Sequence, residues 1–297
     1  MMLQLLQFAE STIGNDQFMI SKDQFGFSFN IFVVLFLLIV IAAGASGYRV
    51  GFLRLLVTIA SVFLSLVLTL LMVPAVHAFF VNSTSMLTSL QLSAEKYVGE
   101  ELDWYAVEYF NNVKRSYSDE RWDLYGKAGL PAELNNADSI APYLDTLSDE
   151  QQDQLVDSLP APAKFREAMK RTLKNPIDIG GKRMSTFSQR MTGAYAVIAS
   201  WGILYAVVYI IVQLIVTIIL TATGVVKKIP LFNTINQVGG LLLGLAFSVV
   251  VMWIVFMFVL AMCHTIPGAG FMKTIELDPL MRFLYDFDIF TNFIQSK

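Results

Sequence analysis

Residues 28–46 read SFNIFVVLFLLIVIAAGAS, a stretch without a single charged side chain. The hydrocarbon core of a bilayer is about 30 Å thick, and a helix rises about 1.5 Å per residue, so about 20 apolar residues span it. Three more stretches meet this requirement: about 53–80, whose only charge is Arg54 at its start, and the uncharged stretches about 193–223 and 238–264. A spanning β-strand would need only about 10 residues of alternating polarity. The sequence therefore predicts four transmembrane helices.

Composition supports a membrane protein over a soluble one. The 297 residues are 55% hydrophobic and 15% charged, whereas a soluble domain carries about 25% charged residues. A soluble protein with several buried helices is the alternative, but four such long runs exceed what a water-soluble core needs. The net charge of −3 gives no reason to expect nucleic acid as a partner. The single cysteine, Cys263, excludes an intrachain disulfide.

The four stretches divide the chain into five parts. Residues 1–27 form an N-terminal tail that lacks the basic start of a cleavable signal peptide. Residues 28–80 and 193–264 form two transmembrane hairpins, and residues 265–297 form an amphipathic tail at the membrane surface. Residues 81–192 form an inserted helical domain outside the cytoplasm. The predicted fold class is an all-α membrane protein with four transmembrane helices in two hairpins.

The central segment concentrates the charges of the chain. Residues 82–192 hold 13 of the 21 basic and 17 of the 24 acidic residues, a net charge of 13 − 17 = −4. Ser148 and Gln151 have the spacing of a capping box and predict a helix that ends near Pro160. Apolar side chains at helical spacing predict a small helical core, with an exposed surface for an unknown protein partner as the alternative; they are Leu155, Leu159, Phe165, Met169, Leu173, Trp104, Tyr105, Tyr109 and Phe110.

Basic residues in the short loops predict the orientation. Arg49 and Arg54 lie between the first two spans, and Lys227 and Lys228 lie between the last two. The positive-inside rule places both loops in the cytoplasm, so the termini and the central segment face outward. Cys263 is then expected near the outer face, within reach of an impermeant thiol reagent.

The tail has the pattern of a surface helix. Asp278 before Pro279 is a good helix start, since proline suits the first helical position. Leu280, Phe283, Leu284 and Phe287 follow at helical spacing and predict an apolar face that lies on the bilayer.

Motifs of catalysis are absent from the sequence. The chain has two histidines, His77 and His264, and lacks HExxH, a Walker loop and GxGxxG. Neighbouring residues on a helix point about 100° apart, so Cys263 and His264 make a poor nucleophile–base pair. We therefore expect no enzyme, no cofactor and no metal site. Tyr205, Tyr209 and Gln213 share one helix face and predict interhelical packing, with a polar pore lining as the alternative.

Glycines border the predicted turns between the spans. Gly240 and Gly244 have the GxxxG spacing that lets two helix backbones approach closely, within one chain or between chains. Residues 47–56 read GYRVGFLRLL, with Gly47, Arg49, Gly51, Phe52 and Arg54 at the positions of a G-x-R-x-G-F-x-R pattern. Residues 229–244 read IPLFNTINQVGGLLLG, in which Asn236, Gly240 and Gly244 form N-x-x-x-G-x-x-x-G.

These two motifs, in this order, resemble those of the colicin V production (CvpA) family of membrane proteins. The resemblance covers about residues 27–80 and 194–290, and the long segment 82–192 departs from compact members. It implies a non-enzymatic protein of the bacterial cytoplasmic membrane, linked to bacteriocin production or export and to envelope homeostasis. The partners expected are the lipid bilayer, a protein bound by residues 82–192 and, as an open alternative, further copies of the chain. The alternative function is an oligomeric small-solute channel or transporter subunit.

Overall fold

Four long helices dominate the computed structural model, which describes residues 19–20, 29–83, 85–99, 106, 144–175, 178–223 and 234–289. These helices are α3 (Ile31–Val50), α4 (Phe52–Ser83), α11 (Phe187–Thr223) and α12 (Thr234–Ala261). Within the described ranges, these four are long and apolar enough to cross a membrane. The prediction of four helices of transmembrane length and composition is confirmed.

Shorter elements surround the ends of this bundle. Two antiparallel ladders of two residues per strand were not predicted: β1 (Met19–Ile20) pairs with β2 (Phe29–Asn30), and β3 (Asp178–Ile179) pairs with β4 (Lys182–Arg183). The other elements among the described residues are helical: α5 (Met86–Ala94), the π-helical turn η1 (Glu95–Gly99), α9 (Asp149–Asp157), α10 (Ala163–Lys174), α13 (Ile266–Leu277) and α14 (Pro279–Asp286).

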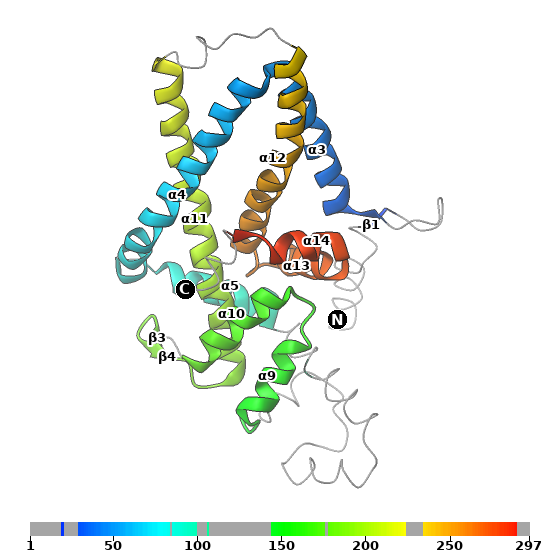
Figure 1. The fold of residues 1–297 in the computed structure, drawn as a ribbon. Helices are drawn as coiled ribbons and strands as arrows, with labels where there is room; N and C mark the ends of the chain where they lie inside the picture. Colours follow the sequence, from blue (N-terminus) through cyan, green and yellow to red (C-terminus); the bar gives the residue numbers. More distant parts are fainter. Residues whose placement is uncertain are drawn as a thin grey trace.

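Packing within the bundle does not follow the order of the chain. The helix α3 packs chiefly on α12, and α4 packs chiefly on α11, while α12 also contacts α4 and α11. Figure 1 shows α3 and α4 diverging from the point where they meet. Only Gly51 separates these two helices, and its φ of 82° lies in a region that favours glycine. The predicted pairing of consecutive helices as two hairpins is therefore not confirmed.

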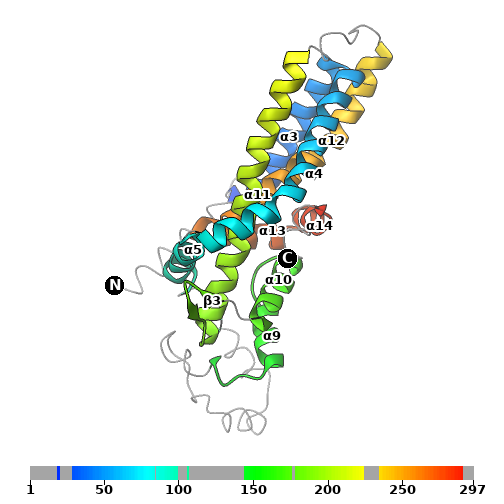
Figure 2. The same cartoon turned by 90° about the vertical axis from the view of Figure 1, so that its left-hand side faces the viewer.

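The bundle has two different ends (Figures 1 and 2). At the first, here the turn end, lie Gly51, the end of α11 at Thr223 and the start of α12 at Thr234. At the opposite end, here the tail end, α13 and α14 run across the bundle between it and α10. Lys227 and Lys228 lie outside the described residues, so of the four predicted loop bases only Arg49 and Arg54 are seen at the turn end.

The helix α11 starts earlier and reaches further than its apolar run predicted. It begins at Phe187 rather than near Gly193, and its 37 residues span about 55 Å, which exceeds the bilayer core. A Cβ atom on Gly202 would lie 2.7 Å from the backbone nitrogen of Ala261, so Gly202 is level with the end of α12. The part of α11 before Gly202 therefore extends beyond the tail end, where α5 and α10 pack on it.

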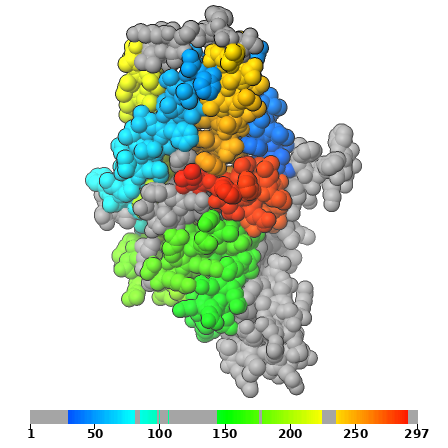
Figure 3. All heavy atoms as spheres, viewed as in Figure 1, coloured from blue at the N-terminus to red at the C-terminus, as the bar shows by residue number. Residues whose placement is uncertain are grey.

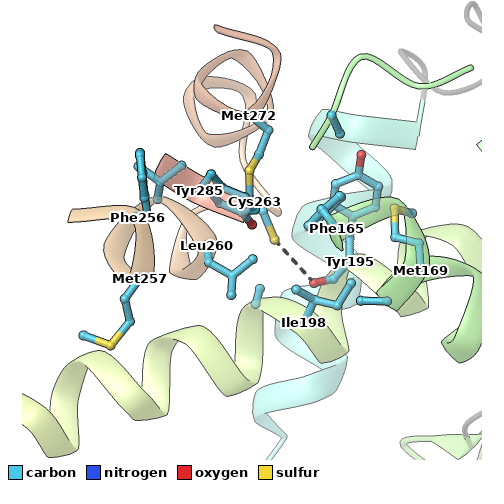
Figure 4. Packing of buried hydrophobic residues seen from close by; sticks show 14 of the residues in the cluster. Phe165, Met169, Tyr195, Ile198, Phe256, Met257, Leu260, Cys263, Met272 and Tyr285 are labelled. Atoms are coloured by element: carbon cyan, nitrogen blue, oxygen red, sulfur yellow. Dashed lines mark hydrogen bonds between the residues drawn. The ribbon is translucent and has the colours of Figure 1, made fainter. Parts of the chain in front are cut away.

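The described part of the central segment packs as expected, but on the bundle as well as on itself. The capping box of Ser148 and Gln151 is confirmed at the start of α9. Phe165 and Met169 on α10 are fully buried, and the Phe165 ring centroid lies 5.3 Å from that of Tyr195 on α11 (Figure 4). One continuous apolar core thus joins α10 to the bundle. The predicted aromatic stripe at residues 104–110 lies outside the described residues.

The tail helix α14 starts where predicted but presents a different face to the core. Asp278 Oδ1 accepts hydrogen bonds from the backbone N–H groups of Leu280 and Met281, so the predicted helix start is confirmed. Of the predicted apolar face only Leu284 is buried; it packs inward with two residues the pattern missed, and the others are exposed: Met281 and Tyr285 inward, and Leu280, Phe283 and Phe287 outward. The bundle binds one side of α14, and the predicted face lies mostly on the other.

Candidate functional site at the contact of two spanning helices

The closest backbone approach of two spanning helices lies between α3 and α12. A Cβ atom on Gly47 would overlap the carbonyl group of Gly240, and one on Gly240 would overlap the carbonyl group of Gly47. One turn further along, a Cβ atom on Gly244 would overlap the carbonyl group of Ala43. Only glycine lets the two backbones touch here. The GxxxG pair therefore makes a contact within one chain.

Asn236 closes this contact at the turn end. Its side-chain Oδ1 accepts a hydrogen bond from the backbone N–H of Leu53 at 3.2 Å, and its amide group lies directly against Gly51. The first N–H groups of a helix lack partners within the helix. Because Gly51 has no side chain to cap α4, Asn236 from α12 does so from across the contact. Phe52 packs beside it on Gly239, at ordinary contact distance.

The eight predicted motif residues thus fall into two groups. Gly47, Gly51, Phe52, Asn236, Gly240 and Gly244 meet at the contact of α3, α12 and the start of α4, here called the glycine contact. Arg49, which is exposed in the last turn of α3, and Arg54, which is half-buried in the first turn of α4, border it. A base in the last turn of a helix interacts favourably with the helix dipole.

A second polar contact, between α4 and α11, was not predicted. The His77 ring stacks on the Trp201 ring, with centroids 3.7 Å apart and 7° between the planes. His77 Nε2 lies 3.0 Å from Ser200 Oγ, and Ser200 donates its own hydroxyl proton to the Val197 carbonyl oxygen. One hydrogen bond and one ring stack thus join His77 of α4 to α11. Residues 123 positions apart with no shared motif gave no signal of this contact.

Cys263 and His264 are adjacent in sequence but do not form a reactive pair. Cys263 is fully buried and its Sγ lies 3.9 Å from the carbonyl oxygen of Tyr195 (Figure 4). Burial raises the pKa of the Cys263 thiol and lowers the pKa of His264. The thiol thus stays protonated and unreactive, and the expectation that a reagent reaches Cys263 from the outer face is wrong. The apolar layer of α11, α12 and α13 covers it.

The polar face of α11 turns toward the bundle. Tyr205 and Tyr209 are buried in the apolar core, as packing between helices requires. Gln213 is half-buried, and its Nε2 lies 3.5 Å from the Thr217 hydroxyl oxygen on the same helix. The two tyrosines therefore contribute to packing between helices.

A charged cluster joins α10 to the tail helices. Glu276 Oε1 on α13 lies 3.7 Å from Nη1 of Arg166 on α10 and 3.7 Å from Nη1 of Arg282 on α14. Asp286 lies close enough to Lys164, Arg166 and Arg282 to interact with their charges, and burial raises its pKa above the usual value. Within the described ranges, no group of three or more His, Cys, Asp or Glu side chains could hold a metal ion.

Comparisons with known proteins do not assign the chain to a family. No protein-family model, no curated protein and no solved structure matches the chain. The resemblance to the CvpA family therefore stays a prediction from the two quoted motifs.

Proposed function

We propose that the chain is a non-enzymatic accessory or scaffold protein of the CvpA type, which supports bacteriocin production or export and envelope homeostasis. The bacterial cytoplasmic membrane is the proposed location. The observation that supports the proposal is the convergence of Gly47, Gly51, Asn236, Gly240 and Gly244 at one contact. These positions are far apart in sequence and carry the family resemblance.

The chemistry of the glycine contact favours a structural role. It consists of backbone groups and one amide, and the Asn236 side chain is engaged by the N–H of Leu53. A catalytic site would need a nucleophile with its base, or an electrophile such as a metal ion. Backbone contact instead fixes the distance between two helices and gives a rigid frame.

The frame carries α9 and α10 at the tail end, opposite the basic residues Arg49 and Arg54. With Arg49 and Arg54 in the cytoplasm, as the positive-inside rule favours, α9 and α10 face outward. The shared core of α10 and α11 holds α10 in a fixed position. A fixed segment outside the membrane suits a docking platform for a protein partner, which is the role proposed for residues 82–192.

Toxin export tests the proposal in a bacterium that makes a colicin V-type toxin and lacks its own CvpA-family protein. We expect the wild-type chain to restore toxin titre in the culture medium. The variant Gly240→Ala should fail to restore it, because the added methyl group overlaps the Gly47 carbonyl. The matched variant Gly239→Ala should restore it, because its Cβ would lie 3.4 Å from Phe52 and needs only a small adjustment.

Two results would overturn the proposal. One is equal titre with and without the chain, while membrane fractions show that it is inserted. The other is solute flux through liposomes that hold the purified protein, lost in a Gln213→Ala variant. Such flux would favour the oligomeric channel or transporter subunit instead.

A further inference from the structure

The outward face of α14 is apolar although the helix is firmly attached to the bundle. Trp253 Nε1 on α12 donates a hydrogen bond to the carbonyl oxygen of Leu284 at 3.1 Å. The Tyr285 ring packs edge-on against Phe256, with centroids 5.3 Å apart (Figure 4). These contacts fix the rotation of α14, so the exposed apolar side chains on it and directly after it keep pointing outward; they are Leu280 and Phe283 on the helix, and Phe287 and Ile289 after it.

Figure 3 shows what borders this face. The band formed by α13 and α14 adjoins the spanning helices α3 and α12 on one side and α10 on the other. The outer sides of α3 and α12 expose apolar side chains such as Leu38 and Leu242. Acyl chains that cover the spans can therefore continue over α14.

Charged side chains between α14 and α10 limit how deep α14 can lie in the bilayer. Arg282 on α14 and Arg166 on α10 both pair with Glu276, and α10 exposes further charges such as Lys164 and Glu167. A charged side chain in the centre of a membrane helix costs about 2.5–3.5 kcal/mol, so α10 belongs outside the hydrocarbon. The boundary of the bilayer thus passes between the apolar face of α14 and the charges of α10.

The cross-section of the bundle differs between its two ends. At the turn end α3 and α12 touch backbone to backbone, and the single residue Gly51 joins α3 to α4. At the tail end α3 and α4 have diverged, Phe79 and Phe80 at the end of α4 are exposed, and α14 adds width (Figures 1 and 3). The protein is therefore wider at the tail end.

We propose that acyl chains of the leaflet at the tail end cover the outward face of α14, and that the protein consequently prefers a bilayer convex on that side. Amphipathic helices that lie in one leaflet expand that leaflet and make binding sensitive to curvature. The divergence of α3 and α4 acts in the same direction. This preference goes beyond the proposed function and does not depend on it.

Spin labels test the position of α14. Cys263 is buried and stays unlabelled, so Phe283→Cys or Phe287→Cys carries the only nitroxide. References are Leu38→Cys, exposed on a span, and Glu150→Cys, exposed on α9. We expect collision rates with oxygen and with a water-soluble nickel complex between those of the two references. Rates equal to those at Glu150→Cys would overturn the proposal. Dipolar broadening between labels would also overturn it, because a second copy would then cover the face.

Vesicle size tests the curvature preference. Protein density is measured on small and large vesicles, counting molecules whose α9 faces outward through a dye on Glu150→Cys. We expect a shift toward small vesicles that is reduced in Phe283→Ser/Phe287→Ser, because the divergence of α3 and α4 remains in this variant. The matched control Phe63→Ser/Leu64→Ser changes exposed residues midway along the span of α4 and should keep the shift. Equal density on both sizes for the wild type, or an unchanged shift in the α14 variant, would overturn the preference.

Discussion

Asn30, the cap of the first spanning helix, donates a hydrogen bond from Nδ2 to the carbonyl oxygen of Thr274 at 2.7 Å, across 244 positions of the chain. Its Oδ1 meanwhile accepts from the backbone N–H of Phe32. One buried side chain thus caps α3 and attaches α13 to its start.

Replacing Asn30 should destabilise the protein at both places. Asn30→Ala leaves two buried backbone groups without partners, each at about 1–3 kcal/mol. We expect a lower free energy of unfolding in detergent by about 2–4 kcal/mol. Asn30→Asp keeps the acceptor for Phe32 and loses the donor to Thr274, so its effect should be similar or larger because a charge is buried. Thermal stability equal to wild type in Asn30→Ala would contradict this role.

The glycine contact should respond sharply to single methyl groups. Gly47→Ala and Gly240→Ala each force a Cβ atom into a carbonyl group of the partner helix. Overpacking in a tight core costs about 1–3 kcal/mol or more, and we expect at least that loss of unfolding free energy. Gly239→Ala is the matched control, because its Cβ would meet only Phe52 at 3.4 Å. Unfolding by denaturant in mixed micelles measures all three, and equal losses would refute the contact.

Cys263 should behave as a reporter of unfolding. The thiol is fully buried and burial raises its pKa, so an impermeant maleimide should not label it in the folded protein, even at mildly alkaline pH. Labelling should appear when the protein unfolds. Glu150→Cys on exposed α9 supplies the control, and its rapid labelling in intact cells would also establish that α9 faces outward. Rapid labelling of wild-type protein under native conditions would contradict the structure.

Asp286 should make stability fall as pH rises through its range. Burial raises its folded pKa above the usual value of 3.8, so the folded state holds the proton more tightly than the unfolded state. The stabilising contribution is complete below the unfolded pKa and is lost as pH rises through the folded pKa. Asp286→Asn should flatten this slope and leave stability at neutral pH equal or higher. Melting temperatures across mildly acidic pH measure it; an unchanged slope in the variant would exclude Asp286 as its origin.

Sequence patterns predicted the elements of this fold better than their partners. The four spans follow from length and charge, because each must cross the same thickness of hydrocarbon. The caps at Ser148 and Asp278 are local, since a side chain meets backbone groups two or three residues away. Hydropathy, in contrast, indicates whether a residue lies in an apolar environment, but not which other residue it packs against. The pairing of α3 with α12 was therefore out of reach.

The candidate site was predicted in its residues and missed in its geometry. Glycine spacing indicated a close contact at Gly240 and Gly244, but not that Gly47 lies opposite. The hydrogen bond from Leu53 to Asn236 joins positions 183 residues apart, and local sequence patterns do not predict contacts over such a separation. The contact of His77 with Ser200 was missed for the same reason. The inward face of α14 was misjudged because apolar side chains occur both among its buried residues and among its exposed ones.

The length of α11 gives the molecule a mechanical property. No proline interrupts its 37 residues, and proline is a common cause of sharp bends in helices. Its first part contacts α10 through the rings of Tyr195 and Phe165, and α4 contacts it at Ser200 through His77. The backbone of Ala261 on α12 packs against Gly202, just beyond Ser200. A force on α10 would therefore be transmitted along one uninterrupted helix to the contacts of α11 with α4 and α12.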